Sequence, residues 1–148
     1  MTVVIVREFC HERSKTVGAE PWLYFVPFQQ DVETALERLR RQEFAAGRYR
    51  GSELRPQSME EAFENMEADG TASILDIMMV ADEPNFCAVA PLAGETLNGI
   101  YGTDQPTRAM VEGRQDFYED IERGQGVYFT VYKDGQPHEL CFAGYSFD

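Results

Sequence analysis

The sequence feature that most constrains the fold is a two-residue turn signal near the end of the chain. Asp134-Gly135 separates Gly126–Lys133 from Pro137–Phe147, two runs rich in β-branched and aromatic residues. An Asp-Gly pair between such runs favours a type I′ turn, because both central residues of that turn need positive φ. The sequence therefore predicts a C-terminal β-hairpin. Bulky residues occupy both sides of its first arm, so we expect both faces of the hairpin to be covered.

Other β-rich segments precede this hairpin. Thr2–Phe9 is rich in Val and Ile, and Trp22–Phe28 is an aromatic run closed by Pro27, which cannot donate to a sheet. Thr71–Met79 has the apolar continuity typical of a strand buried on both faces, and Phe86–Ala90 predicts another short strand. These segments predict a sheet built from both ends of the chain.

The region between the second and third of these strands predicts two helices. Asp31 can cap a helix whose apolar residues follow helical spacing to about Ala46, with Gly47 as its terminator. Ser58 and Glu61 form an S-x-x-E capping box, which predicts the start of the second helix.

Two further helices are expected in the second half of the chain. Gly94–Tyr101 predicts a short helix stopped by Gly102, and a longer helix should run from Pro106 to about Arg123. A chain of 148 residues is the size of one domain. We expect a single α+β domain over residues 1–148, with a mainly antiparallel sheet that ends in the C-terminal β-hairpin and is packed by three or four helices.

Charge is distributed unevenly along the chain, whose net charge is −13. Residues 1–58 hold nine Lys/Arg and eight Asp/Glu, whereas residues 59–148 hold four and eighteen. A surplus of carboxylates repels phosphate backbones, so we expect no nucleic-acid partner. The chain also lacks an apolar run of the length a membrane span needs, so we expect a cytoplasmic protein with no membrane partner.

The cysteines and histidines are candidates for catalytic or metal-binding roles. Cys10, Cys87 and Cys141 are odd in number and widely spaced, which favours reduced thiols over a disulfide framework. Cys10 and His11 would point to opposite faces of a strand, and the spacing of His138 and Cys141 does not suit zinc. The sequence therefore predicts no catalytic residue, no metal and no cofactor.

Asp76 lies inside the apolar run Ile74–Ile77. A buried carboxylate must be paired or hydrogen-bonded, or it takes up a proton, and Arg40 or Arg108 is a natural partner. Such a pair could be a structural ion pair or part of a ligand pocket. A third interpretation is that Asp76 is exposed on an edge strand. The candidate ligand-binding or partner-binding residues are Trp22, Tyr49, Asp76 and Arg108.

Two charged clusters allow more than one interpretation. The basic run contains Arg38, Arg40, Arg41, Arg48, Arg50 and Arg55. It could contact nucleic acid, contact a protein, or neutralise the acidic remainder of the domain, and the overall acidity favours the last two. On the helix after Ser58, the carboxylates of Glu60, Glu64 and Glu67 share one face, which could bind a basic partner, bind a divalent cation or simply be solvated.

Three segments carry recurring motifs. Residues 21–49 combine an aromatic strand, an Asp-initiated helix with A-L-x-x-L-R, and F-x-x-G-x-Y. Residues 70–77 contain G-T-x-S-I-L-D, and residues 101–112 contain Y-G-T-x-x-P-T-R. This set resembles an uncharacterised bacterial protein family. The resemblance implies no activity, cofactor or catalytic residue, but it places Tyr49, Asp76 and Arg108 within recurring motifs.

These observations favour a non-enzymatic protein-binding module with a basic protein as partner. An immunity-like or antitoxin-like role fits by analogy, because acidic surfaces steer basic proteins. The alternative is a small-molecule-binding protein or enzyme with a pocket around Asp76 and Arg108. A homo-oligomer joined through the aromatic hairpin is a third possibility.

Overall fold

The computed structural model describes residues 2–4 and 19–148. The predictions made for Cys10 and His11, and for most of the Thr2–Phe9 strand, lie outside these residues.

The centre of the molecule is a six-stranded mixed sheet with the order β1-β2-β6-β5-β4-β3. The strands are β1 (Thr2–Val4), β2 (Pro21–Pro27), β3 (Met79–Val80), β4 (Ala88–Pro91), β5 (Gly126–Lys133) and β6 (Gln136–Tyr145). Strands β1, β2, β6 and β5 pair antiparallel, whereas β5 with β4 and β4 with β3 pair parallel. The prediction of a mainly antiparallel sheet was therefore wrong. The predicted helices between β4 and β5 form the long crossover that parallel pairing requires.

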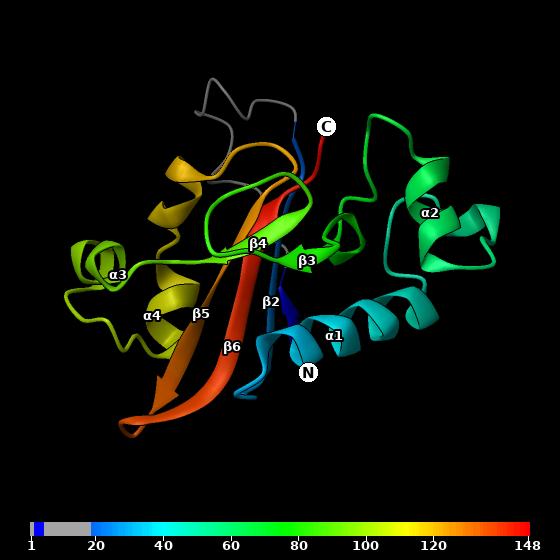
Figure 1. Cartoon of the computed structure of the whole chain (residues 1–148). Helices are drawn as coiled ribbons and strands as arrows, with labels where there is room; N and C mark the ends of the chain where they lie inside the picture. The colour runs from blue at the N-terminus through cyan, green and yellow to red at the C-terminus, as the bar shows by residue number, and fades with distance from the viewer. Residues whose placement is uncertain (1, 5–18) are drawn as a thin grey trace.

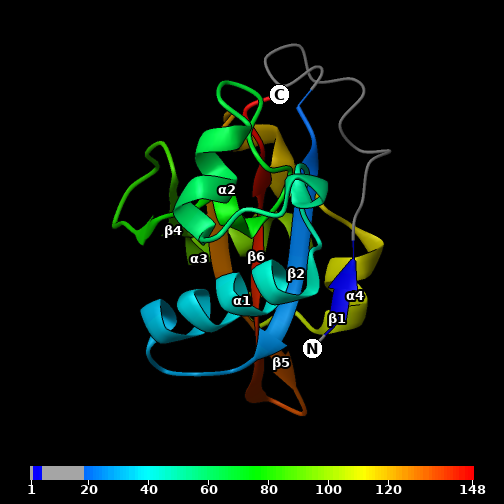
Figure 2. The same ribbon diagram turned by 90° about the vertical axis from the view of Figure 1, so that its right-hand side faces the viewer.

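Helices cover both faces of the mixed sheet, and together they form an α+β domain. Figure 1 shows the second-half helices on one side of the strands and the first-half helices on the other, and Figure 2 shows the latter lying in front of β2 and β6. One side carries α3 (Gly94–Tyr101), α4 (Arg108–Gly113) and the 3₁₀ helix η4 (Asp116–Asp120). The other side carries α1 (Val32–Ala46), α2 (Met59–Asn65) and the 3₁₀ helices η2 (Ser52–Leu54) and η3 (Ile74–Asp76).

Strand β2 contributes to a hydrophobic core on each face of the sheet. Trp22 and Tyr24 pack in the cluster under α1, whereas Leu23 and Phe25 pack in the cluster that includes η4. Consecutive strand residues point to opposite faces, so an unbroken aromatic and apolar run can fill both cores. Strand β6 does the same. On the first arm of the hairpin, β5, one face buries Phe129 and Val131, whereas Tyr128, Thr130 and Tyr132 on the other face are half-buried, so that face is covered only in part.

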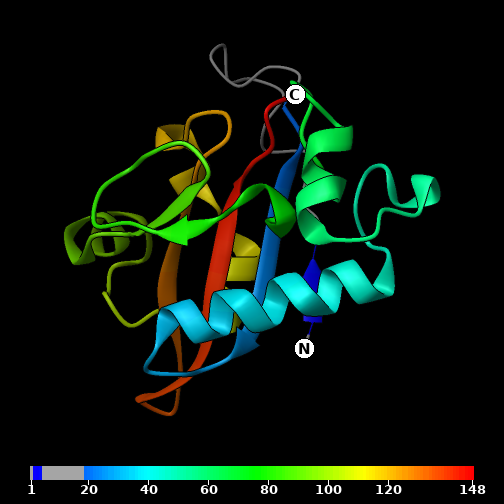
Figure 3. The same ribbon diagram turned by 45° about the vertical axis from the view of Figure 1, so that its right-hand side comes forward.

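Helix α1 matches the prediction at both ends. The Asp31 side chain accepts hydrogen bonds from the backbone N–H of Glu33 and of Thr34, and Gly47 ends the helix at φ 69°. Ala35, Leu36 and Leu39 are buried against the sheet, as their spacing indicates. Figure 3 shows α1 crossing the face formed by β2 and β6.

The predicted hairpin is confirmed. Lys133 pairs with Gln136 across a two-residue turn, in which Asp134 has φ 54° and Gly135 has φ 76°. Positive φ at both positions is the type I′ geometry that the Asp-Gly pair predicts.

The prediction of a buried strand over Thr71–Met79 was wrong. Ala72 has φ 55°, the next residues form η3, and the strand β3 contains only Met79 and Val80. Polar side chains offer the backbone other partners here: Ser73 Oγ accepts from the Leu75 N–H, and Asp76 accepts from the Thr71 N–H. Such local bonds compete with a sheet ladder. An apolar run of this length does not by itself distinguish a strand from a buried helical turn.

The long helix expected between Pro106 and Arg123 is divided in two. Helix α4 ends at Gly113, Arg114 is extended, and η4 follows. The buried Gln115 side chain donates to the carbonyls of Val111 and Glu112, so it satisfies carbonyl groups at the end of α4. Gly113 at this point disfavours continuation of the helix.

Candidate functional site

Asp76 is fully buried and accepts hydrogen bonds at both carboxylate oxygens. Oδ1 accepts from the Thr71 backbone N–H at 2.7 Å and from the Thr71 hydroxyl at 2.8 Å. Oδ2 accepts from the Ser146 hydroxyl at 2.7 Å. Burial raises the pKa of Asp76, and these hydrogen bonds offset part of that rise.

The arginine partner expected for Asp76 is absent from the ion pairs of residues 2–4 and 19–148. Arg40 lies nearby but donates to the backbone carbonyl of Ile77. Arg108 packs on the opposite face of the sheet, over the ring of Phe25. Hydroxyl and amide donors therefore satisfy this buried carboxylate in place of a guanidinium.

The surroundings of Asp76 join two distant parts of the chain. Ser146, which follows β6, also accepts from the Ala72 N–H at 3.1 Å. A Cβ at Gly70 would lie 2.9 Å from Asp76 Oδ2, so the backbone approaches the carboxylate closely on that side. This closed network, formed by Gly70, Thr71, Asp76 and Ser146, ties the segment before η3 to the end of β6. Asp76 is therefore a structural group in this conformation, without access to a ligand.

Arg108 is the predicted site residue that does line an open hollow. Its guanidinium lies 4.3 Å from the centroid of the Phe25 ring and pairs with Glu139 at 3.0 Å and Glu112 at 3.2 Å. The hollow has a volume of about 380 Å³ and lies between the start of α4 and the hairpin tip. Its described lining is Thr107, Arg108, Ala109, Tyr132, Lys133, Asp134, His138 and Glu139.

The other two predicted site residues lie elsewhere. Trp22 is buried in the core under α1, where its ring packs close to the backbone of Gly126 and of Gly144. Tyr49 lies beyond the end of α1 and stacks on Phe44, with 5.8 Å between the ring centroids. The structure thus places Trp22, Tyr49, Asp76 and Arg108 in four separate environments.

The described thiols are not activated. Cys141 is fully buried and burial raises its pKa, while burial and the nearby Asp76 carboxylate raise the pKa of Cys87. A raised pKa lowers the fraction of nucleophilic thiolate at neutral pH. His138 is exposed, whereas Cys141 is buried. Over residues 2–4 and 19–148, no group of three or more metal-ligating side chains comes together.

Three of the six arginines of the basic run hold the fold, whereas Arg38, Arg41 and Arg55 are exposed. Arg48 donates through two nitrogens to Glu43, a fully buried carboxylate on α1. Arg50 donates to the carbonyls of Asp69, Gly70 and Asp148, and the buried Arg40 donates to that of Ile77. These contacts favour the interpretation in which the run serves the domain itself over a nucleic-acid surface.

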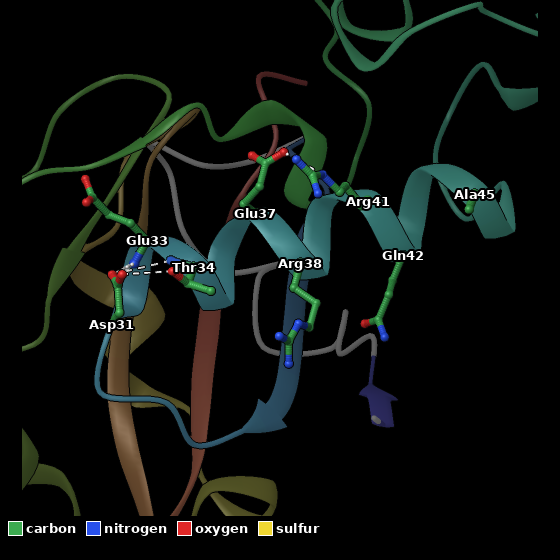
Figure 4. A pocket seen from close by; sticks show the side chains of 8 residues that line it. All are labelled: Asp31, Glu33, Thr34, Glu37, Arg38, Arg41, Gln42 and Ala45. Atoms are coloured by element: carbon green, nitrogen blue, oxygen red, sulfur yellow. Dashed lines mark hydrogen bonds and ion pairs between the residues drawn. The ribbon is translucent and has the colours of Figure 1, made fainter.

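A hollow of about 630 Å³ lies along the outer side of α1. Figure 4 shows the side chains that line it. Its described lining comes from α1 and its cap alone: Asp31, Glu33, Thr34, Glu37, Arg38, Arg41, Gln42 and Ala45. Glu37 and Arg41 pair with each other at 3.1 Å, and Asp31 caps the helix. The hollow is the mixed-charge outer face of a helix and brings no chemistry together.

The acidic half of the chain exposes most of its charge. Fourteen of its eighteen carboxylates are exposed: Glu60, Glu64, Glu67, Asp69, Asp82, Glu83, Glu95, Asp104, Glu112, Glu119, Asp120, Glu122, Asp134 and Asp148. Three of its four cations, Arg108, Arg114 and Arg123, form ion pairs with carboxylates of the same half. The surface over residues 59–148 therefore carries a large negative surplus.

Sequence reasoning missed an exposed apolar surface beside β3. Phe86 and Met79 are 63% and 50% exposed, and Met78 is also exposed. The ring of Phe86 stacks on Phe147, which in turn contacts Phe63. The prediction of a strand buried on both faces over Thr71–Met79 implied no exposed Met in that segment, whereas Met78 and Met79 are exposed.

No helix in the described ranges has the length and apolarity needed to cross a bilayer. Comparison with protein-family models, curated proteins and solved structures gave no match. The resemblance noted in the sequence stays a prediction.

Proposed function

We propose that this protein is a non-enzymatic, cytoplasmic binding module that engages a basic protein through its acidic surface, by analogy with immunity and antitoxin proteins. The observation that carries the proposal is the exposure of fourteen carboxylates over residues 59–148. Surface charge of one sign raises the association rate of oppositely charged partners and disfavours partners of like charge.

The contacts and exposure of the arginines in the basic run support the same proposal. Arg40, Arg48 and Arg50 donate to groups of the fold, which reduces the share of the run that is free to bind a partner. Four arginines of the run, Arg38, Arg41, Arg48 and Arg55, are exposed, against fourteen exposed carboxylates over residues 59–148. A basic protein is the partner that such a surface selects.

The experiment combines partner capture with a kinetic measurement. Proteins retained from a native lysate at low salt are identified, and the association rate of the main basic partner is measured at rising ionic strength. We expect the rate to fall by about tenfold or more, because salt screens long-range steering. Glu60→Gln with Glu64→Gln should lower the rate, whereas Glu33→Gln on α1 serves as the matched control. An association rate insensitive to salt contradicts the proposal.

The alternative function, a small-molecule-binding protein or enzyme, has one supporting observation. The hollow beside Arg108 is large enough for a small ligand and contains both acidic and basic side chains. Asp76 lies on the other side of the sheet, so the two residues do not share a pocket. A thermal-shift screen of small carboxylates and phosphates tests this alternative. It predicts a shift that Arg108→Gln removes, and no shift with any ligand contradicts it.

A further inference from the structure

The hollow between the start of α4 and the tip of the β5–β6 hairpin contains charges of both signs that the fold leaves without partners. We propose that it binds a small zwitterion, a molecule that carries both an ammonium and a carboxylate group. This inference rests on the alternative function given above, a small-molecule-binding protein, and names the class of its ligand. It does not depend on the acidic surface that supports the main proposal.

An irregularity in the hairpin shapes this hollow. Val131 pairs with Glu139, but the next pair along the ladder is Tyr132 with Pro137. His138 is the extra residue of this β-bulge and has no partner across the ladder. Consecutive residues of a regular strand face opposite sides, yet His138 and Glu139 both line the hollow. Bulges redirect side chains in this way and are common beside active sites.

One wall of the hollow is Arg108, which is held from three directions. Nη1 donates to Glu139, Nε donates to Glu112, and the guanidinium lies over the ring of Phe25. Among the contacts of residues 2–4 and 19–148, the Nη2 group has no acceptor. Because these contacts already fix the side chain, binding a carboxylate at Nη2 costs little further side-chain entropy.

The hollow also contains charged groups of both signs that lack partners. Lys133 and Asp134 are exposed and form no ion pair with any described residue, including each other. The Oε1 atom of Glu139 is buried and accepts no hydrogen bond in the described part of the chain. A buried acceptor without a donor is costly. Since Glu139 lines the hollow, an ammonium bound there supplies the missing donor.

The balance of these charges selects the class of ligand. Arg108 and Lys133 give the lining two positive charges, and Asp134 and Glu139 give it two negative charges. An anion leaves both carboxylates without a partner and is repelled by the net charge of −13, whereas a cation leaves Lys133 and the Arg108 Nη2 unpaired. A zwitterion has no net charge, and each of its groups meets an opposite charge. The volume of about 380 Å³ suits a molecule of amino-acid size.

The test compares three forms of one molecule by isothermal titration calorimetry. L-Leucine carries both charges, N-acetyl-L-leucine carries only the carboxylate, and L-leucinamide carries only the ammonium. We expect L-leucine to bind about tenfold more tightly than either blocked form, because each has lost one charge-assisted contact. 6-Aminohexanoate and its two blocked forms repeat the comparison with the charges further apart, and this pattern in either series supports the inference.

Two variants test the two charges separately. Lys133→Gln should reduce the preference for L-leucine over L-leucinamide, and Asp134→Asn should reduce its preference over N-acetyl-L-leucine. The second variant keeps the hairpin, because Asn-Gly favours the same type I′ turn as Asp-Gly. Arg55→Gln and Glu95→Gln are the matched controls, since both residues are exposed and neither lines the hollow.

The outcomes separate this inference from the functions proposed above. Equal binding of L-leucine and N-acetyl-L-leucine would reveal a site for anions, which overturns the zwitterion and leaves the small-molecule alternative standing. Binding that Lys133→Gln and Asp134→Asn leave unchanged also overturns it, and so does absence of binding by all six molecules. None of these results contradicts the association with a basic protein, which its own salt dependence tests.

Discussion

At the scale of single residues, Asp76 shows how a charged group can look functional in a sequence and be structural in the fold. An isolated carboxylate in an apolar run signals either a site or a buried polar network. Three donors from Thr71 and Ser146 show that Asp76 belongs to a buried polar network. The sequence identified the residue but not its partners, because Ser146 lies 70 positions away.

The raised pKa of Asp76 gives a pH-dependent stability. Its folded pKa lies above the unfolded value of 3.8, so the native state binds the proton more readily than the unfolded state. Its contribution to stability is complete below pH 3.8 and is lost as the pH rises through the folded pKa. We expect the free energy of unfolding of the wild type, measured against Asp76→Asn by urea denaturation, to decline over that window. A difference that is flat or grows with pH contradicts this.

Asp76→Ala is the matched test of the hydrogen bonds themselves. Alanine leaves the buried Thr71 N–H without its acceptor, whereas the hydroxyls of Thr71 and Ser146 keep contacts with Ser73 Oγ and the Asp69 carbonyl. The expected loss is about 2 kcal/mol of unfolding free energy, because a buried donor without a partner is costly. Asp76→Asn retains one acceptor oxygen and should lose less. Equal stability of the alanine variant and the wild type would show that the network contributes nothing.

At the scale of elements, local signals predicted the structure where neighbouring residues determine it. The capped helix α1, the helix α3 and the Asp-Gly hairpin appear as expected, since caps and turns act within a few residues. The segment before β3 did not, because its side chains bond to Ser146 and to each other. The separation of Asp76 from Arg108 could not be predicted from the sequence either, because it depends on which face of the sheet each segment packs against.

Two glycines give a matched prediction about packing at this scale. A Cβ at Gly144 in β6 would lie 2.5 Å from the Trp22 ring, and the carbonyl of Gln125 is also too close. Gly99 in α3 has open space around its Cβ position. Gly144→Ala should therefore lower the unfolding free energy by about 3 kcal/mol through overpacking. Gly99→Ala should raise it by about 1 kcal/mol, because alanine favours a helix. Thermal or urea unfolding measures both, and equal effects would contradict the assigned packing.

At the scale of the whole molecule, the dominant feature is the excess of acidic over basic side chains. A net charge of −13 leaves the folded surface repelling itself, and compaction brings those carboxylates closer together than in the unfolded chain. The same surplus that attracts a basic partner therefore costs stability. Binding and folding are linked through one property of the surface.

Salt should therefore stabilise the free protein. Raising ionic strength from low to moderate values screens the repulsion, and we expect Tm to rise by about 4 °C, equivalent to about 1 kcal/mol. Glu64→Lys with Glu95→Lys reduces the net charge and should raise Tm at low salt while shrinking the gain from salt. A Tm that falls on adding sodium chloride would contradict this account.

The position of β2 between β1 and β6 has a consequence for how the sheet assembles. Trp22 lies opposite Gly144, so this pairing closes a loop that contains most of the chain. The β5–β6 hairpin needs only its own turn and can form early, whereas the entropy lost in closing the long loop delays the arrival of β2. Until β2 arrives, the apolar sides of β6 face water. Conditions that slow this last step would expose the newly made chain to aggregation for longer.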